Sequence, residues 1–159
     1  MNGRGFLLLM FAASLLAGCA MFGSMFGPKP VKPDWDSLTL MAAADANANT
    51  ALAVDVVFVK DKELLTNLLA MPAAKYFAAT DSLQRSFPDG LTVLSREVVP
   101  GQNLVLGRAE FKNEKAWAVL AFANYGGAPG DYRVRLPLDQ DRCVLRLEAQ
   151  SFTGCTATH

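Results

Sequence analysis

The sequence has almost none of the side chains that catalysis and metal binding most often use. Its 159 residues include one histidine, His159, which is the last residue. Ser-His-Asp and Cys-His sites need an imidazole held inside the fold, and zinc sites usually combine histidine with cysteine. A phosphate-binding loop is also missing, because Gly126-Gly127 is not followed by a Lys-Ser or Lys-Thr pair. The sequence therefore predicts no catalytic residue, no metal ligand and no cofactor.

Charge is scarce as well. Charged residues make up 19% of the chain, and 15 basic residues balance 15 acidic ones. This balance gives no electrostatic footprint for nucleic acid and no polybasic membrane patch. Arg133, Arg135, Arg142 and Arg146 alternate with other residues, a pattern typical of the solvated face of a sheet.

The one long apolar run lies at the N-terminus. Phe6 to Ala17 contains apolar or small residues apart from Ser14, and it follows a head whose one fixed positive charge is Arg4. These features are typical of a secretory signal peptide. As a helix the run would span only about 18 Å, too little for a hydrocarbon core of about 30 Å, so a permanent transmembrane helix is not expected.

The run ends in Leu16-Ala17-Gly18-Cys19, which resembles the lipobox of bacterial lipoproteins. In such signals the cysteine sulfur receives a diacylglycerol and becomes the first residue after cleavage. The resemblance implies a signal peptide over residues 1–18 and a lipid anchor at Cys19. The alternative is a plain secretory signal with an accidental cysteine. Ala20 stands where inner-membrane retention signals place Asp, which favours the outer membrane.

The two remaining cysteines, Cys143 and Cys155, are an even pair if Cys19 carries lipid. Disulfides persist in exported proteins, so we expect a structural disulfide that stabilises the domain by about 3 kcal/mol in the chain-entropy model. Two isolated thiols are the alternative.

Glycine and proline punctuate residues 19–33, which predicts a lipid-anchored flexible tether before a domain over residues 34–159. In the domain, alternating or continuous apolar runs predict strands near 38–42, 54–59, 91–99, 104–111, 116–125, 132–136 and 143–148. The spacing of leucines predicts a helical insertion over 61–87, with Asp61 as N-cap, a break at Pro72 and a new turn capped by Asp81. The fold class is mainly β, a two-sheet β-sandwich with a short helical insertion.

The loop over residues 43–50 contains small residues, Asp and Asn without an apolar anchor, so we expect it to be exposed. The order of these features resembles the TssJ family, the small outer-membrane lipoprotein of type VI secretion systems. The resemblance is carried by the lipobox, the Pro-rich tether, this loop, the strand Val54–Val59, the Leu-rich insertion and the segment Leu94–Gly101.

The resemblance implies a transthyretin-like β-sandwich, anchored on the periplasmic face of the outer membrane and without enzymatic activity. It implies a docking role toward the periplasmic domain of an inner-membrane secretion component. The family's contact loop maps to these partner-binding residues: Asp45, Ala46, Asn47, Ala48, Asn49 and Thr50. An ordinary solvated connection is the alternative interpretation of this loop.

Two other functions stay open at this point. One is an envelope lipoprotein that binds a small ligand or polymer in a pocket between helices and sheet, under Leu64, Leu68, Phe77 and Phe87. The other is a periplasmic enzyme with a cleft that gathers carboxylates and serine.

Replacing the expected lipid attachment site should change where the protein accumulates. Each buried methylene contributes about 0.8 kcal/mol, so several acyl chains hold a protein on a membrane. We expect Cys19→Ser to give a soluble or unprocessed protein in cell fractionation with antibody detection. Recovery of mature Cys19→Ser protein in the outer-membrane fraction would contradict lipid anchoring at this residue.

Overall fold

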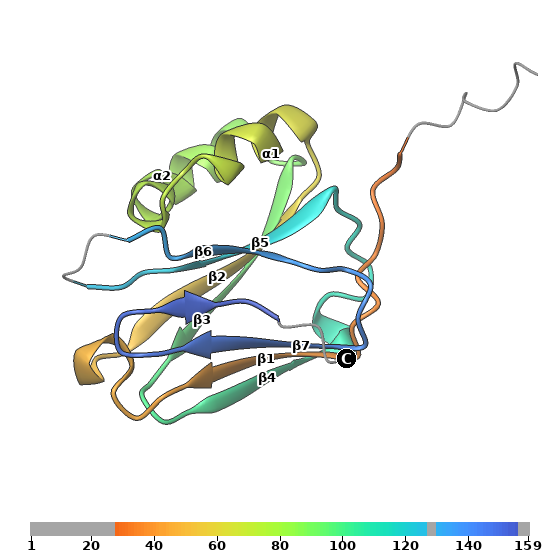
Figure 1. Ribbon diagram of the computed structural model, residues 1–159. Helices are drawn as coiled ribbons and strands as arrows, with labels where there is room; N and C mark the ends of the chain where they lie inside the picture. Colours follow the sequence, from red (N-terminus) through yellow and green to blue (C-terminus); the bar gives the residue numbers. More distant parts are fainter. Residues whose placement is uncertain (1–27, 127–129, 156–159) are drawn as a thin grey trace, which may run out of the picture.

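Three layers stack on one another in the fold (Figure 1). The computed structural model describes residues 28–126 and 130–155. Two helices cover one face of a four-stranded sheet, and a second four-stranded sheet packs on its other face. The predicted signal peptide, Cys19 and most of the tether lie outside the described residues. No helix in the described ranges is both long and apolar enough to cross a membrane.

The two sheets differ in how their strands pair. The outer sheet has the order β4-β1-β7-β8, with β1 parallel to β7 and antiparallel to β4. The middle sheet has the order β3-β2-β5-β6 and is antiparallel throughout. The outer strands are β4 (Asn103–Gly107), β1 (Ser37–Ala42), β7 (Arg142–Leu147) and β8 (Phe152–Thr153). The middle strands are β3 (Leu91–Val98), β2 (Leu52–Val59), β5 (Ala118–Ala123) and β6 (Arg133–Leu136).

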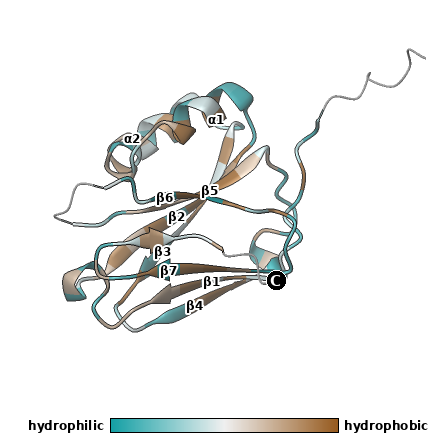
Figure 2. Ribbon diagram, in the orientation of Figure 1, coloured by the Kyte–Doolittle hydropathy of each residue, from teal (hydrophilic) through white to brown (hydrophobic). Residues whose placement is uncertain are grey.

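One core lies between the sheets, where the strands are most hydrophobic (Figure 2). Alternate residues of β1, including Leu38 and Leu40, are fully buried, as the period of a strand with one core face requires. Trp35 closes one end of this core. Its ring meets that of Phe111 edge-on at 5.6 Å, and its indole N–H donates to the Pro137 carbonyl at 2.8 Å. This pairing satisfies the one polar group of a large buried side chain.

A second core lies between the middle sheet and the helices α1 (Lys62–Leu69) and α2 (Ala73–Ser86). All six residues of β5 are buried, as a strand that is covered on both faces requires. Leu64 and Leu68 of α1 contribute to this core, and Asp61 caps α1 by accepting from the Leu64 N–H at 2.7 Å.

A buried polar pair joins α2 to the middle sheet. The ring of Tyr76 stacks on Phe122 with centroids 3.9 Å apart, and its hydroxyl donates to Asp55 Oδ2 at 2.9 Å. Asp55 is only 4% exposed, in the middle of β2. Burial first, and then the adjacent Asp55 charge, raise the pKa of Tyr76 well above its usual value. The phenol therefore stays protonated and donates to the carboxylate.

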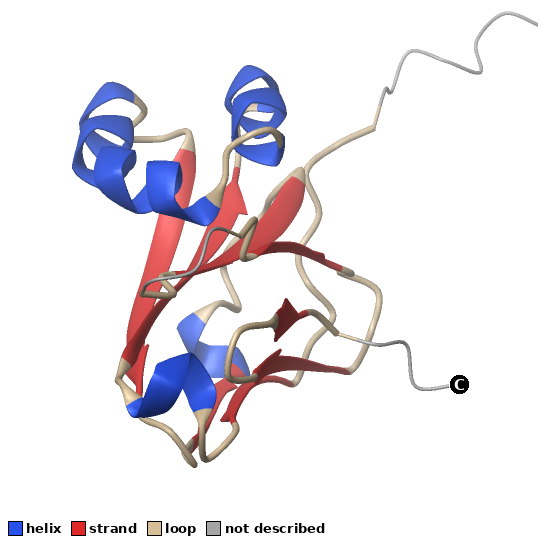
Figure 3. Cartoon of the chain, turned by 60° about the vertical axis from the view of Figure 1, so that its left-hand side comes forward, coloured by secondary structure: helices blue, strands red, loops and turns tan. Residues whose placement is uncertain are grey.

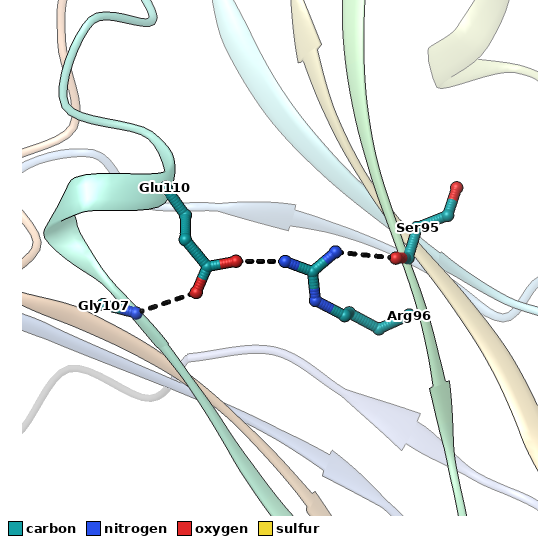
Figure 4. A network of polar contacts seen from close by, with 4 residues as sticks. All are labelled: Ser95, Arg96, Gly107 and Glu110. Carbon is teal, nitrogen blue, oxygen red and sulfur yellow. Dashed lines mark hydrogen bonds and ion pairs between the residues drawn. The ribbon is translucent and has the colours of Figure 1, made fainter.

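The sheets are also linked at the edge formed by β3 and β4 (Figure 4). Arg96 of β3 forms an ion pair with Glu110 in η2 (Arg108–Glu110), the short 3-10 turn after β4. The same guanidinium donates to the Ser95 carbonyl at 2.8 Å, and Glu110 accepts from the Gly107 N–H at 3.3 Å. At the C-terminal side, Cys143 of β7 and Cys155 form a disulfide with Cα atoms 4.9 Å apart.

The predicted elements need three corrections. Helix α2 runs without a break from Ala73 to Ser86, so Asp81 does not begin a new turn. The strand expected over 104–111 ends at Gly107, where η2 begins. Arg133 is half-buried and donates to the carbonyl of Met71 at 3.0 Å, so it does not share a solvated face with Arg142, which lies in the other sheet.

Removing the hydroxyl of Tyr76 should destabilise the domain. Tyr76→Phe keeps the stacking on Phe122 but leaves Asp55 buried without this donor, at a cost of about 1–3 kcal/mol. The double change Asp55→Val with Tyr76→Phe removes both partners and should recover most of the loss. Urea unfolding of the three proteins tests this, and a single variant as stable as the wild type would show that the pair contributes nothing.

Candidate functional site

The candidate site is the connection from β1 to β2, at the end of the sandwich opposite to the tether (Figures 1 and 3). β1 leads away from the tether to Ala42, and β2 returns from Leu52 to Val59. The strand β2 has eight residues and spans about 26 Å, which separates the two ends of the sandwich by a comparable distance.

The central feature of this connection is a left-handed turn. The 3-10 element η1 (Ala46–Asn49) has positive φ angles at three successive residues: 47° at Asn47, 52° at Ala48 and 63° at Asn49. Residues other than glycine adopt this conformation at a cost of roughly 1–2 kcal/mol each, and asparagine tolerates it better than alanine. Such a turn needs compensating interactions, and they come from the loop itself and from a neighbouring loop.

The side chain of Asn47 supplies the main compensation. Its Nδ2 donates to the Ala51 carbonyl at 3.1 Å, and its Oδ1 accepts from the Gly126 N–H at 2.9 Å. The Asn47 side chain therefore joins two loops that are 79 positions apart in the sequence, and only 7% of the residue is exposed. A backbone bond from Thr50 N–H to the Asn47 carbonyl at 3.1 Å closes the turn.

A third loop is tied to the same end of the sandwich by Tyr125. Its hydroxyl lies 2.9 Å from the Glu148 carbonyl and 2.7 Å from the Ser151 carbonyl, and its ring stacks on Tyr132 at 4.3 Å. Burial raises the pKa of Tyr125 to about 12, so the phenol is a donor at any physiological pH. The Asn47 N–H also approaches the Glu148 carbonyl at 3.4 Å. Three loops thus form one hydrogen-bonded end surface.

The structure divides the predicted site residues into two groups. Asp45, Ala48, Asn49 and Thr50 are exposed, as expected for a contact loop. Ala46 and Asn47 are buried, at 1% and 7% exposure, so the expectation of a uniformly exposed loop is wrong there. The reason is that the Asn47 side chain turns inward to satisfy the backbone of Ala51 and of Gly126. Sequence reasoning missed Gly126, which donates to Asn47, and Tyr125, which holds the neighbouring loop at Glu148 and Ser151, because these contacts depend on the tertiary fold.

The helix–sheet layer offers little room for the alternative ligand pocket. Leu64 and Leu68 are buried in a filled core, Phe77 packs at its margin, and Phe87 is 36% exposed at the end of α2. A cavity of about 460 Å³ opens to solvent beside the start of α2, between Pro72 and the stacked rings of Tyr125 and Tyr132. A second cavity, of about 350 Å³, opens to solvent at the end of α2, where Phe87 and Leu91 line it. Both are surface grooves at the layer's edges. The described residues contain no group of three or more histidine, cysteine or carboxylate side chains that could hold a metal ion.

Comparison with solved structures identifies the fold. The T6SS lipoprotein TssJ1 from Pseudomonas aeruginosa superposes with a TM-score of 0.58 and 19% identity, over 84% of this chain and 99% of that protein. The chain has the fold of TssJ1. Serratia marcescens Lip, a membrane-bound component of the type VI secretion system, superposes with a TM-score of 0.54 and 13% identity, over 77% of this chain and 96% of Lip.

A third solved structure, the C-terminal domain of the T6SS protein TssM from EAEC, superposes with a TM-score of 0.52 and 14% identity over 76% of this chain and 97% of that domain. No protein-family profile and no curated protein sequence matches the chain. Similarity at identities of 13–19% establishes the fold alone, so an argument on function also needs the residues of the loop.

Substitutions in the turn should separate its anchor from its strained residue. Asn47→Ala removes both side-chain hydrogen bonds and should cost about 1–3 kcal/mol of unfolding free energy. Ala48→Gly relieves the left-handed strain and should be neutral or stabilise by up to about 1 kcal/mol, because glycine also gains entropy in the unfolded chain. Asp45→Ala is the control, because the Asp45 side chain makes no capping hydrogen bond. Its free energy of unfolding in urea should lie within about 0.5 kcal/mol of the wild-type value. If Ala48→Gly lowers the free energy of unfolding, the conclusion that the backbone is strained at this position is wrong.

Proposed function

We propose that this protein is an outer-membrane lipoprotein, anchored through Cys19, that serves as a docking component of a type VI secretion trans-envelope complex. Its partner is the periplasmic domain of an inner-membrane secretion component, of which a TssM-type C-terminal domain is the candidate. The protein acts by binding and has no enzymatic activity. Support comes from the lipobox-like end of the signal, from the TssJ-like fold and from the geometry of the β1–β2 loop.

The left-handed turn is the observation that carries this proposal. Strained backbone is often found at binding and catalytic sites, where the surrounding structure maintains it. Here the strain is at Ala48 and Asn49, which are exposed, while the bonds that maintain it are made by Asn47 beneath them. The turn therefore presents Asp45, Ala48, Asn49 and Thr50 in a fixed arrangement. A preorganised loop loses less entropy on binding than a mobile one does.

The place of the turn is the second support. The described chain begins at residue 28 at the tether end, and the loop lies at the other end of β1 and β2. In a protein held on a membrane by its tether, the point of attachment is then at the end far from this loop, and the loop is free to face away from the lipid. The loop would then be accessible to a partner that reaches across the periplasm from the inner membrane.

Partner binding should depend on the exposed side chains of the turn while the fold does not. We expect the triple change Asp45→Ala, Asn49→Gly and Thr50→Ala to lower affinity for the TssM-type periplasmic domain at least about ten-fold. Glycine at 49 keeps the positive φ available, and Asn47 stays in place, so unfolding by urea should be unchanged within about 1 kcal/mol. Binding is measured by calorimetry with the partner domain from the same organism.

The matched control carries two changes at the opposite end of the sandwich, Asp139→Ala and Asp141→Ala, which are both exposed. It should bind like the wild type. Equal affinity of all three proteins would move the interface away from the loop. Failure of the wild type to bind the domain would remove the proposed docking role itself.

A further inference from the structure

The lysines of this protein gather at the tether end of the sandwich. Of the seven lysines in the sequence, Lys75 of α2 lies elsewhere. The other six come from three segments: the described start of the chain, the junction of β2 and α1, and the turn before β5. We call them the lysine face: Lys29, Lys32, Lys60, Lys62, Lys112 and Lys115.

Backbone and side-chain contacts bring these three segments together. Val31 and Ala116 form a two-way backbone bridge, with N···O distances of 3.0 and 2.9 Å. Lys60 forms an ion pair with Glu114 at 2.8 Å, and the Lys62 ammonium lies 4.0 Å from the centre of the Trp117 ring. The segments also lie beside one another at the tether side of the molecule in Figure 1.

The lysine face carries a local excess of positive charge. The three segments 28–32, 60–63 and 111–117 contain these six lysines and three carboxylates, those of Asp61, Glu63 and Glu114. Two of these carboxylates are occupied, because Asp61 caps α1 and Glu114 pairs with Lys60. Lys32, Lys62, Lys112 and Lys115 are exposed, and none forms an ion pair with another described residue. At the same end of the sandwich, Asp36 is paired with Arg108 at 2.7 Å, and Asp34, Asp139 and Asp141 are exposed. The excess of positive charge therefore belongs to the lysine face and not to the whole end.

Apolar groups accompany this charge. Trp117 is half-buried beneath Lys62, and Val31 is 51% exposed beside the bridge to Ala116. Tryptophan favours the headgroup level of bilayers, and lysine stems extend their ammonium groups to phosphates while covering apolar surface. A mixture of exposed lysines, a tryptophan and an aliphatic side chain suits a lipid headgroup surface better than a purely polar partner.

The chain outside the structure brings the bilayer within reach. Cys19 precedes Pro28 by nine positions, so a fully extended tether spans at most about 32 Å from the anchor to the lysine face. Anionic lipids attract basic residues only within about a Debye length, which is about 8 Å at physiological salt. A short tether that leaves from the basic face itself therefore permits this contact without any change of fold.

We propose that the lysine face docks on the anionic phospholipid headgroups of the membrane that holds the protein. This inference adds a second membrane contact to the proposed function and rests on its lipid anchor for the location of the bilayer. The contact would orient the sandwich, with β1 and β2 running away from the membrane and the η1 loop at the far end. The lipid anchor alone would leave the domain free to lie on any face.

The test compares the reactivity of lysines within one molecule. The full-length lipidated protein is bound to vesicles of phosphatidylcholine alone or of an equimolar mixture with phosphatidylglycerol. A membrane-impermeant amine reagent then labels lysines, and mass spectrometry gives each labelling rate relative to exposed Lys75 as internal reference. On the anionic vesicles we expect Lys32, Lys62, Lys112 and Lys115 to react at least about three-fold more slowly, and high salt should restore their rates. Equal relative rates on both vesicles would overturn the proposal.

A variant distinguishes lipid contact from other causes of protection. Lys62→Gln, Lys112→Gln and Lys115→Gln together should abolish the protection of Lys32, while Lys75→Gln should leave Lys32 protected. Protection that appears only when an acidic protein is added, and not on anionic vesicles, would assign the face to that protein and overturn lipid docking. Flotation with phosphatidylcholine vesicles reports separately on the anchor. If flotation fails while binding to anionic vesicles persists and needs the three lysines, the anchor is wrong and the lysine face is upheld.

Discussion

The fold depends on the middle sheet being buried on both of its faces. Val56 and Phe58 of β2 point into the core between the sheets, and the neighbouring Val57 and Val59 point into the core under the helices. A strand with two apolar faces needs a cover on each side, so neither the outer sheet nor the helical insertion is optional. The exception in this strand is Asp55, whose burial requires the hydroxyl of Tyr76 and so ties α2 to one position on the sheet.

Local patterns in the sequence were sufficient for α1 and for seven of the eight described strands, because burial on one or two faces determines which positions are apolar. They placed the end of β4 too late and missed the two-residue strand β8. Asp61 is an N-cap that can be recognised from sequence because its partner, the Leu64 N–H, is three residues away. The single helix α2 was harder to predict. Asp81 and Gln84 have the spacing of a capping box, yet packing of Tyr76 and its neighbours on the sheet keeps the helix continuous to Ser86. Tertiary packing here outweighed a local signal.

The candidate site shows the same limit in a sharper form. The sequence pointed to the right loop, since small and Asp/Asn residues between two strands predict a turn. It did not distinguish Asn47 from Asn49, although one is buried and holds Gly126 while the other is exposed with a similar backbone angle. The difference arises from a residue 79 positions away, which no local pattern contains. A short polar residue in a loop can therefore be assigned to a partner contact only after the structure shows that its side chain is exposed.

The distribution of charge on the surface also depends on the tertiary fold. The sequence has no net charge and no basic run, and its composition excludes a polybasic patch. Folding nevertheless brings lysines from three separate segments to one end, because the Val31–Ala116 bridge joins the start of the chain to the turn before β5. The left-handed turn is formed at the other end of the same strands. The strands that build the core thus also separate the lysine face at one end from the left-handed turn at the other, and net charge says nothing about such a separation. An oriented attachment and a distal contact loop follow from one arrangement of β1 and β2.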